Sequence, residues 1–291
     1  MNKRDYRLKG HESFVLREGW LTKGLKVVHD NPRVFSENSG ADALGVGTNM
    51  AKSIRYWLRA AELTEESQRE GVKLTECGNL IFKNDPYFED IFSLWVVHAN
   101  ICRNFKLATS WNIFFNNIDV TFFKRDELIH MMTENIINIT GDTTPPARSI
   151  TDDCAAILHM YTENEDTSPD PEEKKTSPFA VLGFLNRIDA NTFERQHPAM
   201  DTIDPLLILY MITDKLDKEG VLFIDDIVSG DNMPGKVFNL NRVIVNEYLD
   251  QLQNKGYICV NRTAGLDVVY PVGNSTAYAT LQEHYERSNN P

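Results

Sequence analysis

The stretch LGVGTNMAKSIRYWLRAAEL, residues 44–63, decides the fold of the N-terminal part of the chain. Gly45-Val46-Gly47 indicates a turn, and Thr48 is a suitable N-cap for a helix over about residues 49–62. At about 100° per residue, this helix would place Met50, Ile54, Trp57, Leu58 and Ala61 on one side. Its other side would carry Thr48 and three cations, Lys52, Arg55 and Arg59, which together form a cationic ridge. The stretch therefore predicts an amphipathic helix with an exposed cationic face.

The sequence around this helix predicts a complete module. Apolar spacing indicates a helix over about Leu16–His29 that ends before Pro32, and Ser39 or Asp42 opens a short second helix. After the cationic ridge, residues 63–64 and 72–74 are expected to pair as a hairpin around SQREG. Helix, short helix, helix and hairpin in this order are typical of a winged helix-turn-helix.

The remaining sequence predicts a helical middle domain and a second winged helix-turn-helix. Apolar helical patterns fill residues 85–161, and the polar segment at about 163–177 indicates a disordered loop before the strand-like FAVLGFLNRI. From Asp204, with Pro205 at the first helical position, the earlier order of helices and hairpin recurs. The expected fold class is mainly α with small β-hairpins (α+β). The expected domains are residues 1–83, 84–203 and 204–291.

Composition limits the class of protein. The chain has 291 residues, and 42% of them are hydrophobic, which is enough for a packed core. No run of about 18 apolar residues indicates a membrane span, and the basic N-terminus lacks the apolar segment of a signal peptide. The four cysteines form no CxxC pair, which argues against a disulfide framework or a cysteine zinc site. We expect a cytoplasmic protein.

Charge is distributed unevenly along the chain, whose formal net charge is −12. Residues 1–60 hold 11 Lys/Arg and 6 Asp/Glu, a net of +5, whereas the other 231 residues hold 19 and 36, a net of −17. A basic end on an acidic chain indicates a polyanionic partner, and double-stranded DNA suits a winged helix. The expected DNA contacts are Thr48, Asn49, Lys52, Arg55, Tyr56 and Arg59, with Arg69 and Lys73 in the wing.

Two alternatives stay open for this face, namely a solvated helix surface and a surface that binds an acidic protein. The N-terminal tail indicates either a basic arm beside the DNA or a frayed terminus. Its basic residues are Lys3, Arg4, Arg7 and Lys9.

The C-terminal module is a weaker DNA candidate. Residues 204–273 carry 6 Lys/Arg against 10 Asp/Glu, and these acids would repel phosphate. We therefore favour protein–protein contact or a structural role there. The DNA contacts that it offers are Lys236, Asn239, Arg242 and Arg262.

Motifs for catalysis or cofactor binding are weak. Gly45-x-Gly47 lacks the third glycine and the preceding strand of a dinucleotide site, and the seven histidines show no metal-ligand spacing. Cys77 and Cys154 have no neighbouring cation that would activate a thiol for sulfur transfer. The acids of residues 85–90 and 152–153 are a minority indication of a magnesium-dependent nuclease. No catalytic residue, metal site or cofactor is predicted.

Several segments of the sequence together resemble a bacterial family known as the domain of unknown function number four thousand and seven. The resemblance covers roughly residues 10–270 and is carried by HESFVLREGWLTKGL, ALGVGTNMAKSIRYWLRAAEL, LTECGNLIF, DPYFED, SLWVVH, SITDDCAAILHMY and TSPFAVLGFL. Members of that family are commonly encoded beside sulfur-transfer genes for DNA phosphorothioate modification, a backbone marking used in phage defence. The resemblance implies a role in such a system and assigns no reaction.

These observations together predict a non-enzymatic DNA-binding adaptor. Its N-terminal module would hold DNA, and its acidic remainder would bind sulfur-transfer or other DNA-modification proteins. One alternative is a transcriptional regulator of the same gene cluster, and another is a magnesium-dependent DNA nickase. Homo-oligomer formation is left open.

Overall fold

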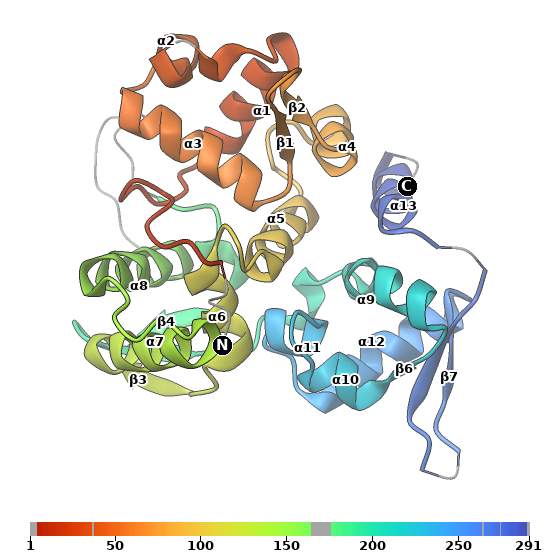
Figure 1. The fold of residues 1–291 in the computed structure, drawn as a ribbon. Helices are drawn as coiled ribbons and strands as arrows, with labels where there is room; N and C mark the ends of the chain where they lie inside the picture. Colours follow the sequence, from red (N-terminus) through yellow and green to blue (C-terminus); the bar gives the residue numbers. More distant parts are fainter. Residues whose placement is uncertain (1–4, 37, 164–175, 264, 274, 290–291) are drawn as a thin grey trace. The chain divides into compact units, whose positions relative to one another are not determined.

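A computed structural model describes residues 5–36, 38–163, 176–263, 265–273 and 275–289 as mainly helical with small antiparallel sheets (Figure 1). This is the α+β class expected from the sequence. The chain divides into two compact units, Met1–Gln196 and His197–Pro291. The first predicted domain and nearly all of the second lie within the first unit, and the three-domain division stays a prediction. Among the described residues, no helix has the length and apolar character needed to span a membrane.

The N-terminal part of the first unit has the predicted order of helices and hairpin. Helix α1 begins at Trp20 rather than near Leu16, because Gly19 takes a left-handed conformation with φ of 75°. Thr48 is the first residue of α3, so Gly47 and not Thr48 occupies the N-cap position. The elements are α1 (Trp20–Asp30), η1 (Val34–Ser36), η2 (Asn38–Gly40), α2 (Ala41–Leu44), α3 (Thr48–Ala60), β1 (Thr64–Ser67), β2 (Gly71–Leu74) and α4 (Glu76–Asn84).

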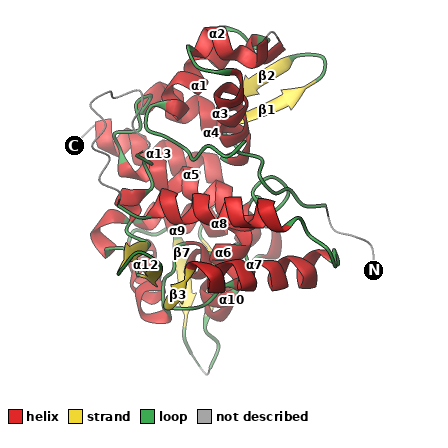
Figure 2. Ribbon diagram, turned by 90° about the vertical axis from the view of Figure 1, so that its left-hand side faces the viewer, coloured by secondary structure: helices red, strands yellow, loops and turns green. Residues whose placement is uncertain are grey.

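Strands β1 and β2 form the predicted antiparallel hairpin, which Figure 2 shows in yellow near α1 and α3. Their register runs from Thr64 opposite Leu74 to Ser67 opposite Gly71. The amide of Val72 donates to the carbonyl of Pro32 at 2.8 Å, which fixes the second strand against the segment that follows α1. The hairpin therefore has a fixed place beside the helices.

The rest of the first unit is a helical bundle with one small sheet. Strand β5 pairs antiparallel with β3 on one side and β4 on the other. The predicted helices of residues 85–161 are present, but the strand-like FAVLGFLNRI is a 3-10 turn followed by a three-residue strand. The elements are α5 (Ile91–Arg103), α6 (Thr109–Asn117), β3 (Phe122–Lys124), α7 (Arg125–Thr140), α8 (Ala147–Tyr161), η3 (Ala180–Leu182), β4 (Leu185–Arg187) and β5 (Thr192–Arg195).

Aromatic side chains fill the centre of this bundle. His98 lies in contact with the rings of Phe115, Tyr161 and Phe184, and its Nδ1 is 2.8 Å from the hydroxyl of Tyr161. It is fully buried and packs among these rings. Most of the loop predicted at about 163–177 lies outside the described residues.

The second unit repeats the order of helices and hairpin. Asp204 caps α9 by accepting from the amide of Leu206 at 2.8 Å, and Pro205 occupies the first turn, as predicted. Strand β8 pairs with β6 and with β7. The elements are η4 (Met200–Thr202), α9 (Pro205–Glu219), β6 (Leu222–Phe223), α10 (Ile224–Ser229), α11 (Pro234–Val237), α12 (Arg242–Asn254), β7 (Ile258–Asn261), β8 (Val268–Pro271) and α13 (Ala277–Asn289).

Candidate nucleic-acid interface

Helix α3 is held rigidly by its buried side. Trp57 and Leu58 are fully buried, and Ile54 is 1% exposed. Ser53 Oγ and Trp57 Nε1 both donate to the carbonyl of Phe14, each at 3.2 Å. Because two side chains from this helix share one acceptor, rotation of α3 about its axis would break both hydrogen bonds. The opposite side of α3 is therefore the side that faces solvent.

The start of the solvent-facing side is polar and accessible. Thr48, Asn49 and Lys52 are exposed, and the hydroxyl of Thr48 donates to Asn38 at 3.3 Å. Within the described part of the chain, no ion pair to Lys52 is present. Lys52 is thus the member of the cationic ridge whose charge is available to a partner.

Arg55 and Arg59 are bound to an acid of the hairpin. Arg55 donates through Nε to Glu66 Oε1 at 2.6 Å and through Nη2 to Oε2 at 2.9 Å. Arg59 Nη1 lies 3.3 Å from the same Oε2. The two arginine side chains are 38% and 35% exposed, whereas that of Glu66 is 18% exposed. One half-buried carboxylate therefore neutralises part of the cationic ridge.

A pocket of about 490 Å³ opens beside this cluster. Arg55, Arg59 and Glu66 line it, together with Phe35 and the start of β2. The guanidinium of Arg55 lies over the ring of Phe35, 5.4 Å from its centroid. An aromatic face under a guanidinium restrains its plane while leaving its N–H groups available. Phe35 thus orients the fork that Arg55 presents.

Tyr56 does not belong to the exposed face. Its side chain is only 5% exposed, and its hydroxyl donates to the carbonyl of Leu107 at 3.0 Å. Burial raises the pKa of Tyr56 above its ordinary value, and the negative charge of Asp153 adds to that rise. Tyr56 is therefore buried rather than presented on the face where its contact with DNA was predicted, and the structure gives that contact no support.

The hairpin carries the other two predicted contacts. Arg69 and Lys73 are both exposed, and Lys73 Nζ pairs with Glu70 at 2.7 Å. An exposed pair of this kind is worth at most about 1 kcal/mol, so it does not prevent Lys73 from meeting a phosphate. Arg69 and Lys73 stay candidates.

The N-terminal segment is bound to the first unit. Lys9 Nζ pairs with Asp152 at 2.6 Å, and the guanidinium of Arg7 lies over the ring of Tyr56. His11 Nε2 and Ser110 Oγ both contact the buried carboxylate of Asp153, at 2.9 Å and 2.6 Å. Arg7 and Lys9 therefore form neither a free arm nor a frayed end. Lys3 and Arg4 lie outside the described residues.

The three cations of the second unit that were weaker DNA candidates, Lys236, Arg242 and Arg262, are paired with acids. Lys236 pairs with Asp231 at 2.6 Å, and Arg262 pairs with Asp250 at 2.7 Å. Arg242 bridges Asp225 and Asp267. The backbone carbonyl of Asn239 is hydrogen-bonded to the ring of His197. The weaker group of DNA candidates thus lies in a charge-neutralised surface.

Most of the cysteines and acids that were candidates for sulfur transfer or magnesium binding are buried or hydrogen-bonded within the fold. Burial raises the pKa of Cys77 to about 12 and moves that of Cys154 above its ordinary range, which disfavours both thiolates. Asp85 accepts from the amides of Glu89 and Asp90 at 2.9 Å and 3.2 Å. Among the described residues, no group of three or more His, Cys, Asp or Glu side chains is arranged to hold a metal ion.

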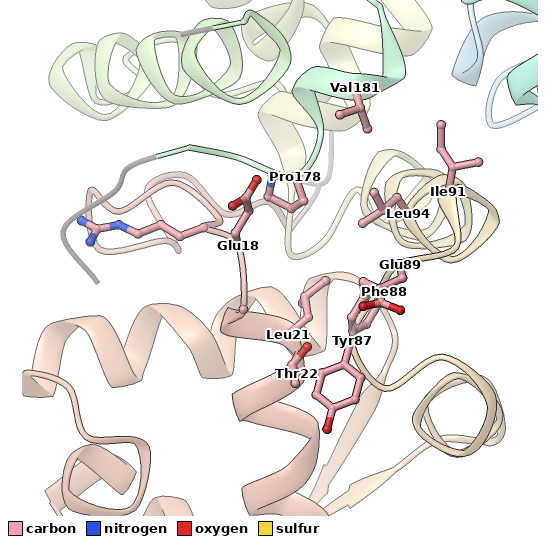
Figure 3. Close-up of a pocket in the computed structure, with 12 residues that line it drawn as sticks. Glu18, Leu21, Thr22, Tyr87, Phe88, Glu89, Ile91, Leu94, Pro178 and Val181 are labelled. Carbon is pink, nitrogen blue, oxygen red and sulfur yellow. The ribbon is translucent and has the colours of Figure 1, made fainter. Parts of the chain in front are cut away.

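A separate pocket of about 400 Å³ lies in the first unit between the segment before α1, the start of α5 and η3. Figure 3 shows its lining, in which the carboxylates of Glu18 and Glu89 accompany apolar side chains such as Leu21 and Leu94. With two acids, a single cation (Arg17) and an apolar wall, this lining suits phosphate less well than the arginine pair at α3. The cluster at α3 is therefore the better candidate for a nucleic acid.

Glu66 and Phe35 were missed in the sequence. A signal for Glu66 was present, because side chains alternate along a strand and Thr64 and Glu66 share a face. Thr64 is buried, so the side chain of Glu66, on the same face of β1, is expected to point toward the helix. Phe35 gave no comparable signal, since its position depends on how η1 packs.

Comparisons with known proteins give a fold likeness and a family. The chain is similar to a magnesium-ion-bound crystal structure of SspB, with a TM-score of 0.84, 22% identity, and coverage of 98% of this chain and 89% of that one. A second SspB crystal structure is similar with a TM-score of 0.85 and 22% identity, and the likeness covers 100% of this chain and 91% of that one. No curated protein matches the sequence. The model of a family described as a protein of unknown function, DUF4007, matches residues 8–285, and this chain therefore belongs to that family.

Proposed function

We propose that this chain is a DNA-binding accessory protein of a bacterial DNA phosphorothioate-modification system. In this proposal the N-terminal helices and hairpin act as a winged helix-turn-helix with α3 against DNA. The observation that carries it is the cationic ridge, whose three cations lie on the solvent-facing side of α3 within the net-positive part of the chain. Lys and Arg on such a helix neutralise phosphates and supply most of the affinity for DNA.

The acidic second unit is the proposed docking part for protein partners of the modification system. Its candidate DNA contacts Lys236, Arg242 and Arg262 are paired with acids, and acids outnumber cations there, so it has little positive charge to offer to phosphate. Three exposed apolar side chains flank the Asp225–Arg242–Asp267 bridge in the sequence, and they are Phe223, Val243 and Leu266. Apolar groups beside charges are typical of protein–protein contact surfaces.

DNA binding by the full chain in a salt series tests the proposal. A variant with Lys52, Arg55 and Arg59 all replaced by alanine is expected to lose about 10- to 100-fold in affinity at ~100 mM salt. The slope of log K against log salt should fall by roughly 2 to 3. Thermal unfolding of the variant controls for folding. Unchanged binding by the folded variant would contradict the assignment.

A second candidate is magnesium-dependent DNA nicking. The observation that favours it is the description of the similar SspB structure as magnesium-bound. Supercoiled plasmid incubated with the wild-type chain should then become open-circular with Mg²⁺ and stay supercoiled with EDTA. Asp152, which pairs with Lys9 at the surface, is the first carboxylate to replace with asparagine. Plasmid that stays supercoiled with Mg²⁺ removes this candidate.

A further inference from the structure

Glu66 occupies the same guanidinium groups that a DNA phosphate would use. We propose that Arg55 and Arg59 form a phosphate site and that Glu66 is its internal competitor, which lowers the affinity of the free protein for DNA. This inference rests on the proposed function and adds a regulatory residue to it. In the proposed binding reaction, the carboxylate leaves the two arginines when a phosphate arrives.

The geometry of the pair supports competition. A guanidinium presents two parallel N–H groups that fit a carboxylate and a phosphate equally well. Arg55 uses both of these groups on the two oxygens of Glu66, at 2.6 Å and 2.9 Å, and Arg59 reaches the second oxygen. A phosphate cannot use the same fork until Glu66 has moved. The carboxylate is therefore a stand-in for the proposed ligand.

The surroundings are suited to such an exchange. The guanidinium of Arg55 is restrained by Phe35, so it keeps its orientation when its partner changes. The pocket of about 490 Å³ beside it is open to solvent and large enough for a phosphodiester group. Pro32 and Val72 also line it, and the hydrogen bond between them holds this part of the wall in place. The arginines and the wall can thus stay in place while the side chain of Glu66 rotates.

Electrostatics give the direction of the effect. Glu66 reduces the charge of the arginine pair from two to one and would repel a phosphate that stayed nearby. Arginines that already have an anionic partner also release fewer counterions from DNA. Removal of the carboxylate charge is therefore expected to raise both the affinity for DNA and its dependence on salt.

The neighbouring residue on β1 provides a matched control. Glu65 is exposed, and among the described residues it has no ion-pair partner. Glu65→Gln changes the net charge of the chain by the same amount as Glu66→Gln. It leaves the Arg55–Arg59 cluster intact, so it reports the effect of removing one acid from β1 outside that cluster, opposite Lys73.

The experiment measures binding of a fluorescent DNA duplex by full-length wild type, Glu66→Gln, Glu66→Ala and Glu65→Gln between ~50 and ~300 mM salt. Both Glu66 variants are expected to bind about threefold to tenfold more tightly at ~100 mM salt, with a salt slope steeper by about 1. Glu65→Gln should show a smaller gain and the wild-type slope. Thermal unfolding confirms that each variant is folded.

The outcomes separate the inference from the proposed function. If all four proteins bind DNA and the Glu66 variants match Glu65→Gln, Glu66 is no competitor and the DNA-binding proposal stands. If none of the four binds at ~50 mM salt, both fall. If only the Glu66 variants bind, the competitor is strong enough to block the free protein, which supports the inference.

Discussion

Arg55 and Glu66 are joined by two parallel hydrogen bonds, at 2.6 Å and 2.9 Å, that link α3 to the first strand of the hairpin. The same contact connects two elements and neutralises part of the charge that would bind DNA. It distinguishes Arg55 from Lys52, which lies on the same helix without an ion pair in the described part of the chain. The members of the cationic ridge are therefore expected to respond differently to substitution.

Lys52→Ala is expected to weaken duplex binding about threefold to tenfold at ~100 mM salt, because one phosphate contact is lost. The free energy of unfolding should change by no more than about 0.5 kcal/mol, since the side chain is exposed. Fluorescence anisotropy and urea unfolding measure the two quantities. Lys26→Ala on α1 removes the same charge from an exposed site outside the ridge. An equal loss in both variants would contradict a specific role for Lys52.

Tyr56→Phe is expected to destabilise the chain by about 1 kcal/mol without weakening DNA binding. The substitution removes a buried donor and leaves the carbonyl of Leu107 without that partner. Urea unfolding and anisotropy measure the effects side by side. A variant of unchanged stability with clearly weaker binding would return Tyr56 to the set of DNA contacts.

Gly71→Ala is expected to destabilise the hairpin by about 2 to 4 kcal/mol. Gly71 has a φ of 87°, and an added Cβ would lie 2.3 Å from the carbonyl oxygen of Pro32. The backbone conformation costs about 1 kcal/mol or more in a non-glycine residue, and the clash with a backbone atom adds to it. Gly141→Ala is the control, because its φ is 72° and nothing lies within 4 Å of the added Cβ. Equal unfolding free energies in the two variants would show that the Pro32 contact is unimportant.

Local sequence signals predicted the elements around the candidate site well. The hairpin over residues 64–74 and the cap at Asp204 followed from turn residues and capping chemistry, which act within a few residues. The spacing of apolar residues at the helical period of 3.6 residues also placed Trp57 and Ile54 on the buried side of α3. These features depend on neighbouring residues and so can be read before tertiary structure is known.

The partners of the site could not be predicted in the same way. Tyr56 is buried because the carbonyl of Leu107, far away in the sequence, accepts from its hydroxyl. Arg55 is neutralised because the hairpin folds back onto α3 and brings Glu66 to it. Helical spacing gives the face of a residue on its own helix, but it does not tell what another element places there.

Asp204→Asn is expected to weaken α9 by about 1 kcal/mol at pH 6 to 7, because the amide keeps the cap but loses the charged hydrogen bond to His284, and this difference from wild type shrinks in acid. Burial by itself raises the pKa of Asp204, but the hydrogen bonds from His284 and from the amide of Leu206 outweigh it and hold the pKa below its usual range. A carboxylate with a lowered folded pKa contributes stability that is complete above the unfolded pKa of about 3.9. That contribution is lost as the pH falls through the folded pKa.

Amide hydrogen exchange of residues 207–210, measured for both proteins from pH 6 to pH 3.5 after correction for intrinsic rates, follows this difference directly. Asp214→Asn is the matched control, because Asp214 is an exposed acid of the same helix whose side chain makes no hydrogen bond or ion pair among the described residues. Protection in the control should follow that of wild type at every pH. A difference between wild type and Asp204→Asn that grew toward low pH would mean that protonated Asp204 stabilises the helix better than the carboxylate, contrary to the lowered pKa.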